Sequence, residues 1–127
     1  MADSRAVTIQ GLKQRLAEAS TDAGRLAVLL ELRNRTTELP RIEAEAYLRE
    51  AVELARKTRS YKELALAGIG LSQVCRDAGD IEASLESAGI VQEAARASGN
   101  PNHEGQYFYL VGRAYQAKGD YGEARNL

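Results

Sequence analysis

The sequence predicts an all-α protein made of stacked helix pairs, and three observations lead to this. Ala, Leu, Glu and Arg are abundant and only 2 of the 127 residues are Pro, a composition typical of helices. Apolar residues recur three and four positions apart along most of the chain. The pair Gly79-Asp80 returns forty positions later as Gly119-Asp120, each time after a helix-like run. A fixed period of this size is typical of a helical repeat array, whose usual work is to present a surface to a partner.

This pattern predicts six helices, over about residues 5–19, 22–37, 41–58, 61–78, 81–98 and 102–118. The first is an amphipathic leading helix, with Leu12 and Leu16 one turn apart among charged residues. Ser20-Thr21-Asp22 supplies side-chain oxygens that can cap the second helix. The second helix carries a leucine band wide enough to predict neighbours on more than one side. Leu39-Pro40 ends it, because proline lacks an amide hydrogen and restricts the residue before it.

The ends of the later helices are marked by polar joints and glycine. Arg59-Ser60 separates the third helix from the fourth. Gly79 can take the left-handed backbone that closes the fourth helix, and Asp80 can cap the fifth. The fifth helix ends at Ser98-Gly99-Asn100-Pro101. By the same reasoning Gly119-Asp120 ends the sixth, which leaves too few residues for a partner helix, so we expect the chain to stop within a repeat.

Charge and composition argue against several classes of protein. The formal net charge is −1 and neither half carries a basic stripe, so nucleic acid and membrane surfaces are not expected partners. Cys75 is the single cysteine, which excludes an internal disulfide. No apolar run reaches the roughly 18–20 residues of a membrane span, and the sequence starting at Met1 has no apolar signal core. We therefore expect one compact cytoplasmic unit.

The last part of the chain carries the most specific pattern. It reads Leu110-Val111-Gly112-Arg113-Ala114-Tyr115 and then Gly119-Asp120-Tyr121-Gly122-Glu123-Ala124. This order of a small residue, an aromatic a turn later and a Gly-Asp-aromatic turn resembles a tetratricopeptide repeat (TPR). The corresponding places one period earlier are taken by Ser72, Cys75, Gly79 and Ser84. The resemblance implies a right-handed superhelix of antiparallel helix pairs in one domain, 1–127, with repeats at about 22–58, 61–98 and 102–127, the last incomplete.

The resemblance also implies which residues pack and which bind. The small residues expected where two helices cross closely are Ser72, Ser84, Gly112 and Ala124. Residues that contact a partner in such a fold line its concave face, one position and one turn after the small position. In this sequence they are Arg33, Gln73, Arg76, Arg113 and Gln116. Their guanidinium and amide groups are suited to a peptide carboxylate or an acidic segment.

The helix pairs repeat every forty residues rather than about 34 as in the consensus repeat, which is similar to TPR segments of bacterial signalling proteins. This implies a non-catalytic regulatory or docking segment of a larger protein, with a protein or peptide partner and no cofactor. Two alternatives stay open. Self-association through the unfinished repeat would use Tyr121, Ala124 and Leu127. A small-molecule pocket would use Tyr107, Phe108, Tyr109 and Tyr115.

Neither the single histidine nor the single cysteine has the neighbouring residues that a catalytic or metal site requires. His103 is the single histidine, in a polar segment without an orienting partner or further metal ligands, so we expect a solvated helix start. Cys75 stands on the apolar side of its helix, where a thiol behaves as an inert hydrophobe. The sequence therefore predicts no catalytic and no metal site. Gly68 lies inside a helix pattern and is expected to allow close helix packing.

Overall fold

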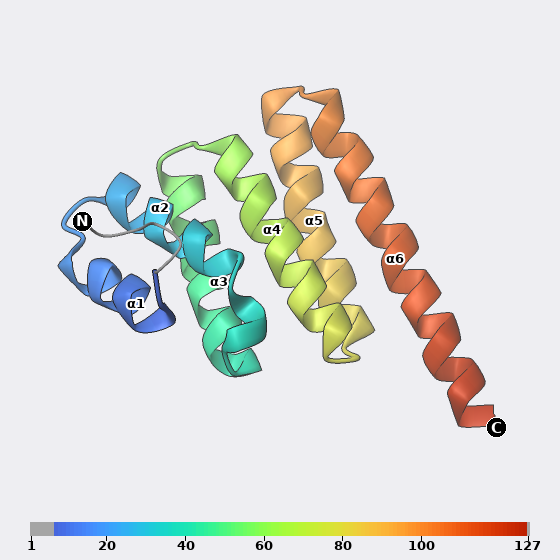
Figure 1. Ribbon diagram of the computed structural model, residues 1–127. Coiled ribbons are helices and arrows are strands. Elements are labelled where there is room, and N and C mark those ends of the chain that lie inside the picture. The colour runs from blue at the N-terminus through green and yellow to red at the C-terminus, as the bar shows by residue number, and fades with distance from the viewer. Residues whose placement is uncertain (1–6, 127) are drawn as a thin grey trace.

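The structure, a computed structural model, describes residues 7–126, with the side chains of residues 7–119. Within this part the chain forms six α-helices and one short 3-10 helix, packed sequentially in antiparallel pairs and without strands (Figure 1). The elements are α1 (Ile9–Glu18), α2 (Asp22–Arg33), η2 (Thr36–Glu38), α3 (Arg41–Lys57), α4 (Tyr61–Asp77), α5 (Ile81–Ser98) and α6 (Pro101–Asn126). The all-α prediction is confirmed, as are the positions of the first five helices to within a few residues. α2 ends at Arg33 rather than at about residue 37, because the chain turns into the 3-10 helix η2 before it reaches Leu39-Pro40.

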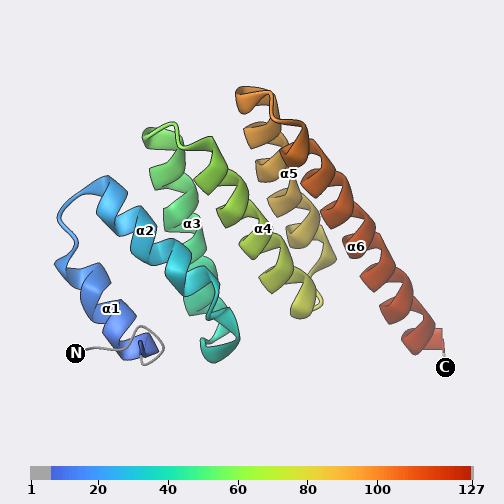
Figure 2. The ribbon, with the colours of Figure 1, turned by 45° about the horizontal axis from the view of Figure 1, so that its top comes forward.

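The helices form two layers. Each helix packs on the next in the chain, and in addition α2 packs on α4 and α4 packs on α6. These three helices therefore make one layer, and α3 and α5 lie behind them (Figure 2). Long side chains tie α3 to α5, since Arg56 donates to both carboxylate oxygens of Glu93 at 2.8 and 3.0 Å and Arg41 reaches Asp80 at 3.0 Å.

The helix ends follow the predicted capping chemistry. Thr21 Oγ1 accepts a hydrogen bond from the amide of Gly24 at 3.0 Å, and Asp80 Oδ1 accepts one from Ala83 at 3.1 Å. Gly79 has φ +81° and Gly99 has φ +68°, the left-handed conformation that glycine accepts without steric cost. The chain reversals after α4 and α5 therefore depend on local residues that the sequence displays.

The core is tightest where α4 crosses α5. Ser72 and Ser84 are fully buried there, and each hydroxyl donates to the other residue's backbone carbonyl, at 3.0 and 2.8 Å. A Cβ atom on Gly68 would lie 3.0 Å from Val91 Cγ2 and 3.1 Å from Ile90 Cγ2. The prediction that Ser72, Ser84 and Gly68 are packing residues at a close crossing is confirmed.

The predicted end of the last helix is wrong. α6 continues as one helix from Pro101 to Asn126, through Gly119-Asp120, and extends past the neighbouring helices toward the C-terminus (Figure 1). A chain reversal places two helices in contact, and the burial gained offsets the lost helical hydrogen bonds. No helix packs back after Gly119 within the described residues, so the backbone keeps its helical conformation, at a cost of about 1 kcal/mol for a glycine in a helix interior.

One further expectation needs correction. Gly112 was expected at a close crossing, but it is exposed and a Cβ atom there would meet nothing within 4 Å. As at Gly119, the reason is that residues 7–126 form no helix after α6 that could cross α6 at Gly112. Ala124 lies outside the residues whose side chains are described. Phe108 and Tyr115 are 61% and 57% exposed.

We expect Gly79→Ala and Gly119→Ala to have opposite effects on stability. Alanine at Gly79 must adopt a positive φ, which costs about 1–2 kcal/mol. Alanine at Gly119 replaces a helical glycine, so the free energy of unfolding should stay level or rise by up to about 1 kcal/mol. Urea unfolding followed by circular dichroism measures both. A loss at Gly119 equal to that at Gly79 would mean that a turn does form there.

The crossing of α4 and α5 should not tolerate bulk. Gly68→Leu forces side-chain atoms into the space of Val91 and Ile90, and we expect it to lower the free energy of unfolding by about 1–3 kcal/mol. The matched control is Gly89→Ala in α5, where a Cβ atom meets nothing within 4 Å and where helix propensity should raise stability slightly. Equal effects of the two substitutions in thermal unfolding would contradict the close crossing.

Candidate functional site

The five residues predicted to bind a partner lie on the layer formed by α2, α4 and α6, and we call their surface the α2–α4–α6 face. α2 contributes Arg33, α4 contributes Gln73 and Arg76, and α6 contributes Arg113 and Gln116. Within α4 and within α6 the two residues are three positions apart, so each pair shares one side of its helix. Nη1 of Arg113 donates to Oε1 of Gln116 at 3.4 Å.

The aliphatic part of Arg33 lies directly on α4. A Cβ atom on Gly70 would be 2.8 Å from Cγ of Arg33, so only a glycine leaves room for this side chain. Gly70 stands one turn before Gln73 on the same side of α4, which places Arg33 beside Gln73. The structure thus places the Arg33 side chain against α4 one turn before Gln73, a residue forty positions later in the sequence.

Two of these arginines have buried nitrogen atoms without an acceptor. Nε of Arg33 and Nη1 of Arg76 are buried, and no protein atom of the described residues accepts a hydrogen bond from them. Burial also lowers the pKa of Arg33 from its usual value, because desolvation disfavours the charged form and no neighbouring carboxylate opposes it. A buried charged donor without an acceptor costs free energy, which an incoming anion would relieve.

Of the eight other arginines whose side chains the structure describes, six form ion pairs and two, Arg59 and Arg96, do not. The ion pairs join Arg15 to Glu31, Arg25 to Glu50, Arg35 to Glu38, Arg41 to Asp80, Arg49 to Glu45 and Arg56 to Glu93. By contrast, Arg33, Arg76 and Arg113 have no carboxylate within 4.0 Å in the described part of the chain. The α2–α4–α6 face therefore carries positive charge that the described residues do not neutralise.

Clefts on both layers are shallow. One of about 240 Å³ lies between the first turns of α4 and α6, lined by Lys62, Ala65, Leu66, Asn102, His103 and Gln106. Another of about 290 Å³ lies between α3 and α5 over Leu71 of α4, flanked by charged Arg49, Glu53, Arg56 and Glu86. The cleft between α4 and α6 lies in the same layer as the α2–α4–α6 face, and its polar lining includes Lys62, Asn102 and Gln106.

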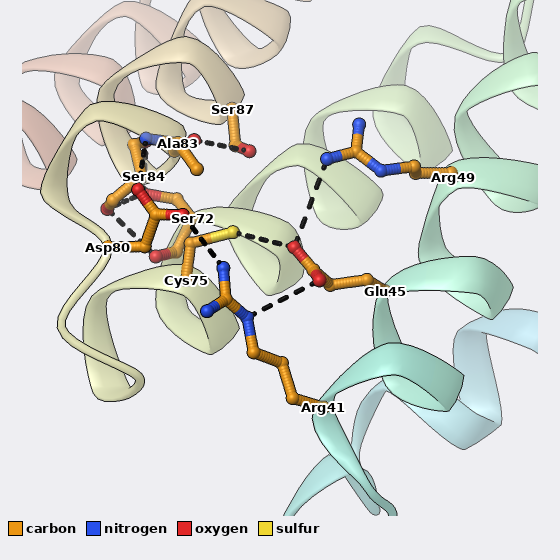
Figure 3. A network of polar contacts seen from close by, with 9 residues as sticks. All are labelled: Arg41, Glu45, Arg49, Ser72, Cys75, Asp80, Ala83, Ser84 and Ser87. Atoms are coloured by element: carbon orange, nitrogen blue, oxygen red, sulfur yellow. Dashed lines mark hydrogen bonds and ion pairs between the residues drawn. The ribbon is translucent and has the colours of Figure 1, made fainter.

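The interior of the helix stack holds a polar network around Cys75 (Figure 3). Sγ of Cys75 donates to Oε1 of Glu45 at 3.2 Å, and Glu45 forms ion pairs with Arg41 at 3.4 Å and with Arg49 at 3.9 Å. Desolvation, and then the hydrogen bond to Glu45, raise the pKa of the Cys75 thiol to about 11. The amide of Ala83 and the guanidinium of Arg41 lower the pKa of Asp80. A buried protonated thiol is a structural group, as predicted.

Two predictions about aromatic residues and histidine are wrong. His103 does lie in the first turn of α6, but it is only 8% exposed and its Nδ1 is 3.0 Å from Oε1 of Gln106, because α4 covers this turn. A pocket lined by all four of Tyr107, Phe108, Tyr109 and Tyr115 does not form. Tyr107 and Phe108 line a cleft of about 190 Å³ between α5 and α6, with ring centroids 5.3 Å apart, whereas Tyr109 and Tyr115 are exposed and do not line it.

Comparison with known protein families, with characterised proteins and with solved structures finds no match for this chain. Among the described residues no cluster of three or more His, Cys, Asp or Glu side chains has the arrangement of a metal site. No helix in residues 7–126 is long and apolar enough to cross a membrane.

The sequence reasoning missed the carboxylate that holds Cys75 and the pairing state of the arginines. Glu45 contacts Cys75 across 30 positions of the chain, and Arg41 contacts Asp80 across 39. The spacing of Arg41 and Glu45, four apart on one helix, was the available signal for their ion pair. Nothing local indicates which distant helix either residue faces.

The titration of Cys75 should make stability depend on pH in the alkaline range. The folded chain favours the protonated thiol, since its pKa of about 11 exceeds the roughly 8.5 of an unfolded cysteine. The stabilising contribution is complete below pH about 8.5 and decreases as pH rises toward 11, by up to about 1.4 kcal/mol per unit. Urea unfolding across this range should show a steeper decrease of stability with pH in the wild type than in Cys75→Ala, because Tyr47 and Lys13, whose pKa values are also raised, titrate in both. Equal slopes would contradict it.

Proposed function

We propose that this chain is a non-catalytic protein–protein interaction module with a TPR-like right-handed superhelix. The α2–α4–α6 face would be its concave groove, and the ligand an acidic peptide or an acidic segment of a partner domain. The observation that carries the proposal is the set of three arginines without carboxylate partners on that face, in a chain whose other arginines are mostly paired. The context implied by the resemblance is the regulatory or docking segment of a larger bacterial signalling protein.

The three arginines would contribute unequally. Hydrogen bonds to charged groups add about 1.5–3 kcal/mol when they satisfy buried donors, and Arg33 and Arg76 each hold one such nitrogen. Arg113 is exposed, and an exposed ion pair adds only about 0.2–1 kcal/mol. Gln73 and Gln116 can bond the peptide backbone through their amides. Affinity should therefore depend mainly on carboxylates placed near α4, and less on those near α6.

Catalysis and small-molecule sensing have less support. The clefts are open rather than enclosed, and of the four aromatic residues expected to line a pocket only Tyr107 and Phe108 share a cleft. Neither His103 nor Cys75 has the exposed, activated environment of a general base or nucleophile. No cofactor is part of the proposal.

Binding of an acidic peptide tests the proposal. The probe is a fluorescein-labelled peptide with Asp and Glu alternating with Leu and Ala, titrated with the protein by fluorescence anisotropy. We expect Arg76→Ala combined with Arg113→Ala to weaken binding by about tenfold or more, because two charge-assisted contacts are lost. Added salt should also weaken binding, since exposed charges are screened.

The matched control is Arg96→Ala. Arg96 is an exposed arginine in the last turn of α5 without an ion pair among the described residues, and it lies outside the α2–α4–α6 face. We expect it to leave the affinity unchanged. Equal weakening by both variants would mean that the peptide senses only net charge, and binding of a Lys-substituted peptide with the same affinity would exclude recognition by these arginines.

A further inference from the structure

The side of α6 that faces away from the core is apolar and uncovered. Leu110 and Ala114 bury one side of α6 against the preceding helices. Phe108 and Tyr115 project on the other side, and with Tyr109 they make up three of the four exposed large apolar side chains of the described residues. α6 lies at the end of the row of helices, with no helix beyond it in either view (Figures 1 and 2). Exposed aromatic residues gathered on one helix typically mark an interaction surface.

These side chains follow a seven-residue repeat together with glycines. Gly105, Gly112 and Gly119 are seven apart, and so are Phe108 and Tyr115, three positions after the first two glycines. We call this row of five residues the α6 outer stripe. In a coiled coil, two positions of each seven-residue repeat, spaced alternately three and four residues apart, form the contact with the second helix. The glycines and aromatic residues of the stripe have this spacing. A Cβ atom on any of the three glycines would meet nothing within 4 Å, whereas one on Gly68 or Gly70 would touch a neighbouring helix.

We propose that a second copy of this chain covers the α6 outer stripe, as an antiparallel pair of α6 helices whose two-fold axis crosses the seam midway between Phe108 and Gly112. In an antiparallel pair, a residue at one contact position packs against a residue at the other contact position of the partner helix. Since glycines occupy one position and aromatic residues the other, each aromatic ring meets a glycine. Phe108 packs on Gly112 of the partner subunit, and Tyr115 packs on Gly105 of the partner subunit. The two-fold axis repeats both contacts. Large and small residues thus alternate across the seam, and the stripe is complementary to itself.

Charge favours the same arrangement. Glu104 and Lys118 are exposed, two seven-residue periods apart, and both stand beside the stripe on the same edge. In an antiparallel pair, equivalent edges of the two helices lie together, so Glu104 comes within reach of Lys118 of the partner subunit, and this happens twice. A parallel pair places opposite edges together and gains neither ion pair. The occupant that fits both the apolar and the charged groups is therefore this same helix in reverse.

The pair is expected to be weak. A covered aromatic side chain buries roughly 150–250 Å², so the exposed parts of four rings contribute on the order of 500 Å² to the contact. With the glycine backbone and the flanking side chains, the total stays below the roughly 1,200 Å² of a standard interface. We therefore expect a reversible dimer with a dissociation constant in the micromolar range, so that the fraction of dimer depends on the protein concentration.

Gly112→Gln separates association from folding. The substitution puts a side chain where an aromatic ring of the partner would pack, and we expect it to weaken the dimer by about tenfold or more. Glutamine is also a better helix former than glycine, so the monomer should melt at the same temperature or higher. Sedimentation velocity over a concentration series, from low micromolar to near millimolar, measures the dissociation constant. The matched control is Gly89→Gln on α5, which also replaces a glycine with open space around it and should dimerise like the wild type.

A charge exchange tests the direction of the pair. Glu104→Lys alone should weaken the dimer several-fold, and Glu104→Lys with Lys118→Glu should restore it, because the exchange rebuilds both ion pairs in an antiparallel arrangement only. A chain that stays monomeric at every concentration overturns the proposal, as does a Gly112→Gln variant that dimerises with wild-type affinity. If Leu127→Glu removes the dimer and Gly112→Gln does not, the interface is the terminal segment and the α6 outer stripe is not involved. None of these substitutions changes a residue of the α2–α4–α6 face.

Discussion

The close approach of α4 and α5 fixes the rest of the helix stack. Two backbones come near enough for Ser72 and Ser84 to exchange hydroxyl-to-carbonyl hydrogen bonds in a fully buried position. These hydroxyls have no access to water, so each would be costly to bury without the other. Gly68 sets the approach on the next turns, against Val91 and Ile90. The direction of α5 follows from this crossing, and through α5 so does the position of α6, which packs on both helices.

The helix ends could be predicted where local residues determine them, and not where they depend on packing between helices. The ends of α1 to α5 are set by caps and turns that a sequence displays, such as Thr21 and Gly79. Gly119-Asp120 has the same letters as Gly79-Asp80 but no second helix to pair with among the described residues. A Gly-Asp pair permits a reversal without requiring one, and a reversal is stable only when burial between two helices compensates for it. Identical local residues therefore gave one turn and one uninterrupted helix.

The candidate site was predictable in its residues but not in its electrostatics. The resemblance to the repeat pattern selected Gln73, Arg76 and Arg113, and they do lie on one layer. Which arginines are neutralised depends on contacts between helices far apart in sequence, such as Arg15 with Glu31 and Arg56 with Glu93. Nε of Arg33 is buried, and the side chain of Arg33 lies in the space that Gly70 leaves on the neighbouring helix α4. These features need the packed structure.

The pairing of the arginines gives the two layers different chemistry. On the layer of α3, Arg41, Arg49 and Arg56 all face carboxylates, and these pairs hold α3 to α5 or to itself. An anionic partner on α3 would have to displace an existing ion pair and would gain little. On the α2–α4–α6 face the buried nitrogens of Arg33 and Arg76 have no acceptor among the described residues, so the proposed acidic ligand would not have to break an ion pair there. The internal ion pairs therefore do more than stabilise the stack, because they neutralise the basic side chains of α3 and leave the unpaired guanidinium groups of the α2–α4–α6 face available to the proposed acidic ligand.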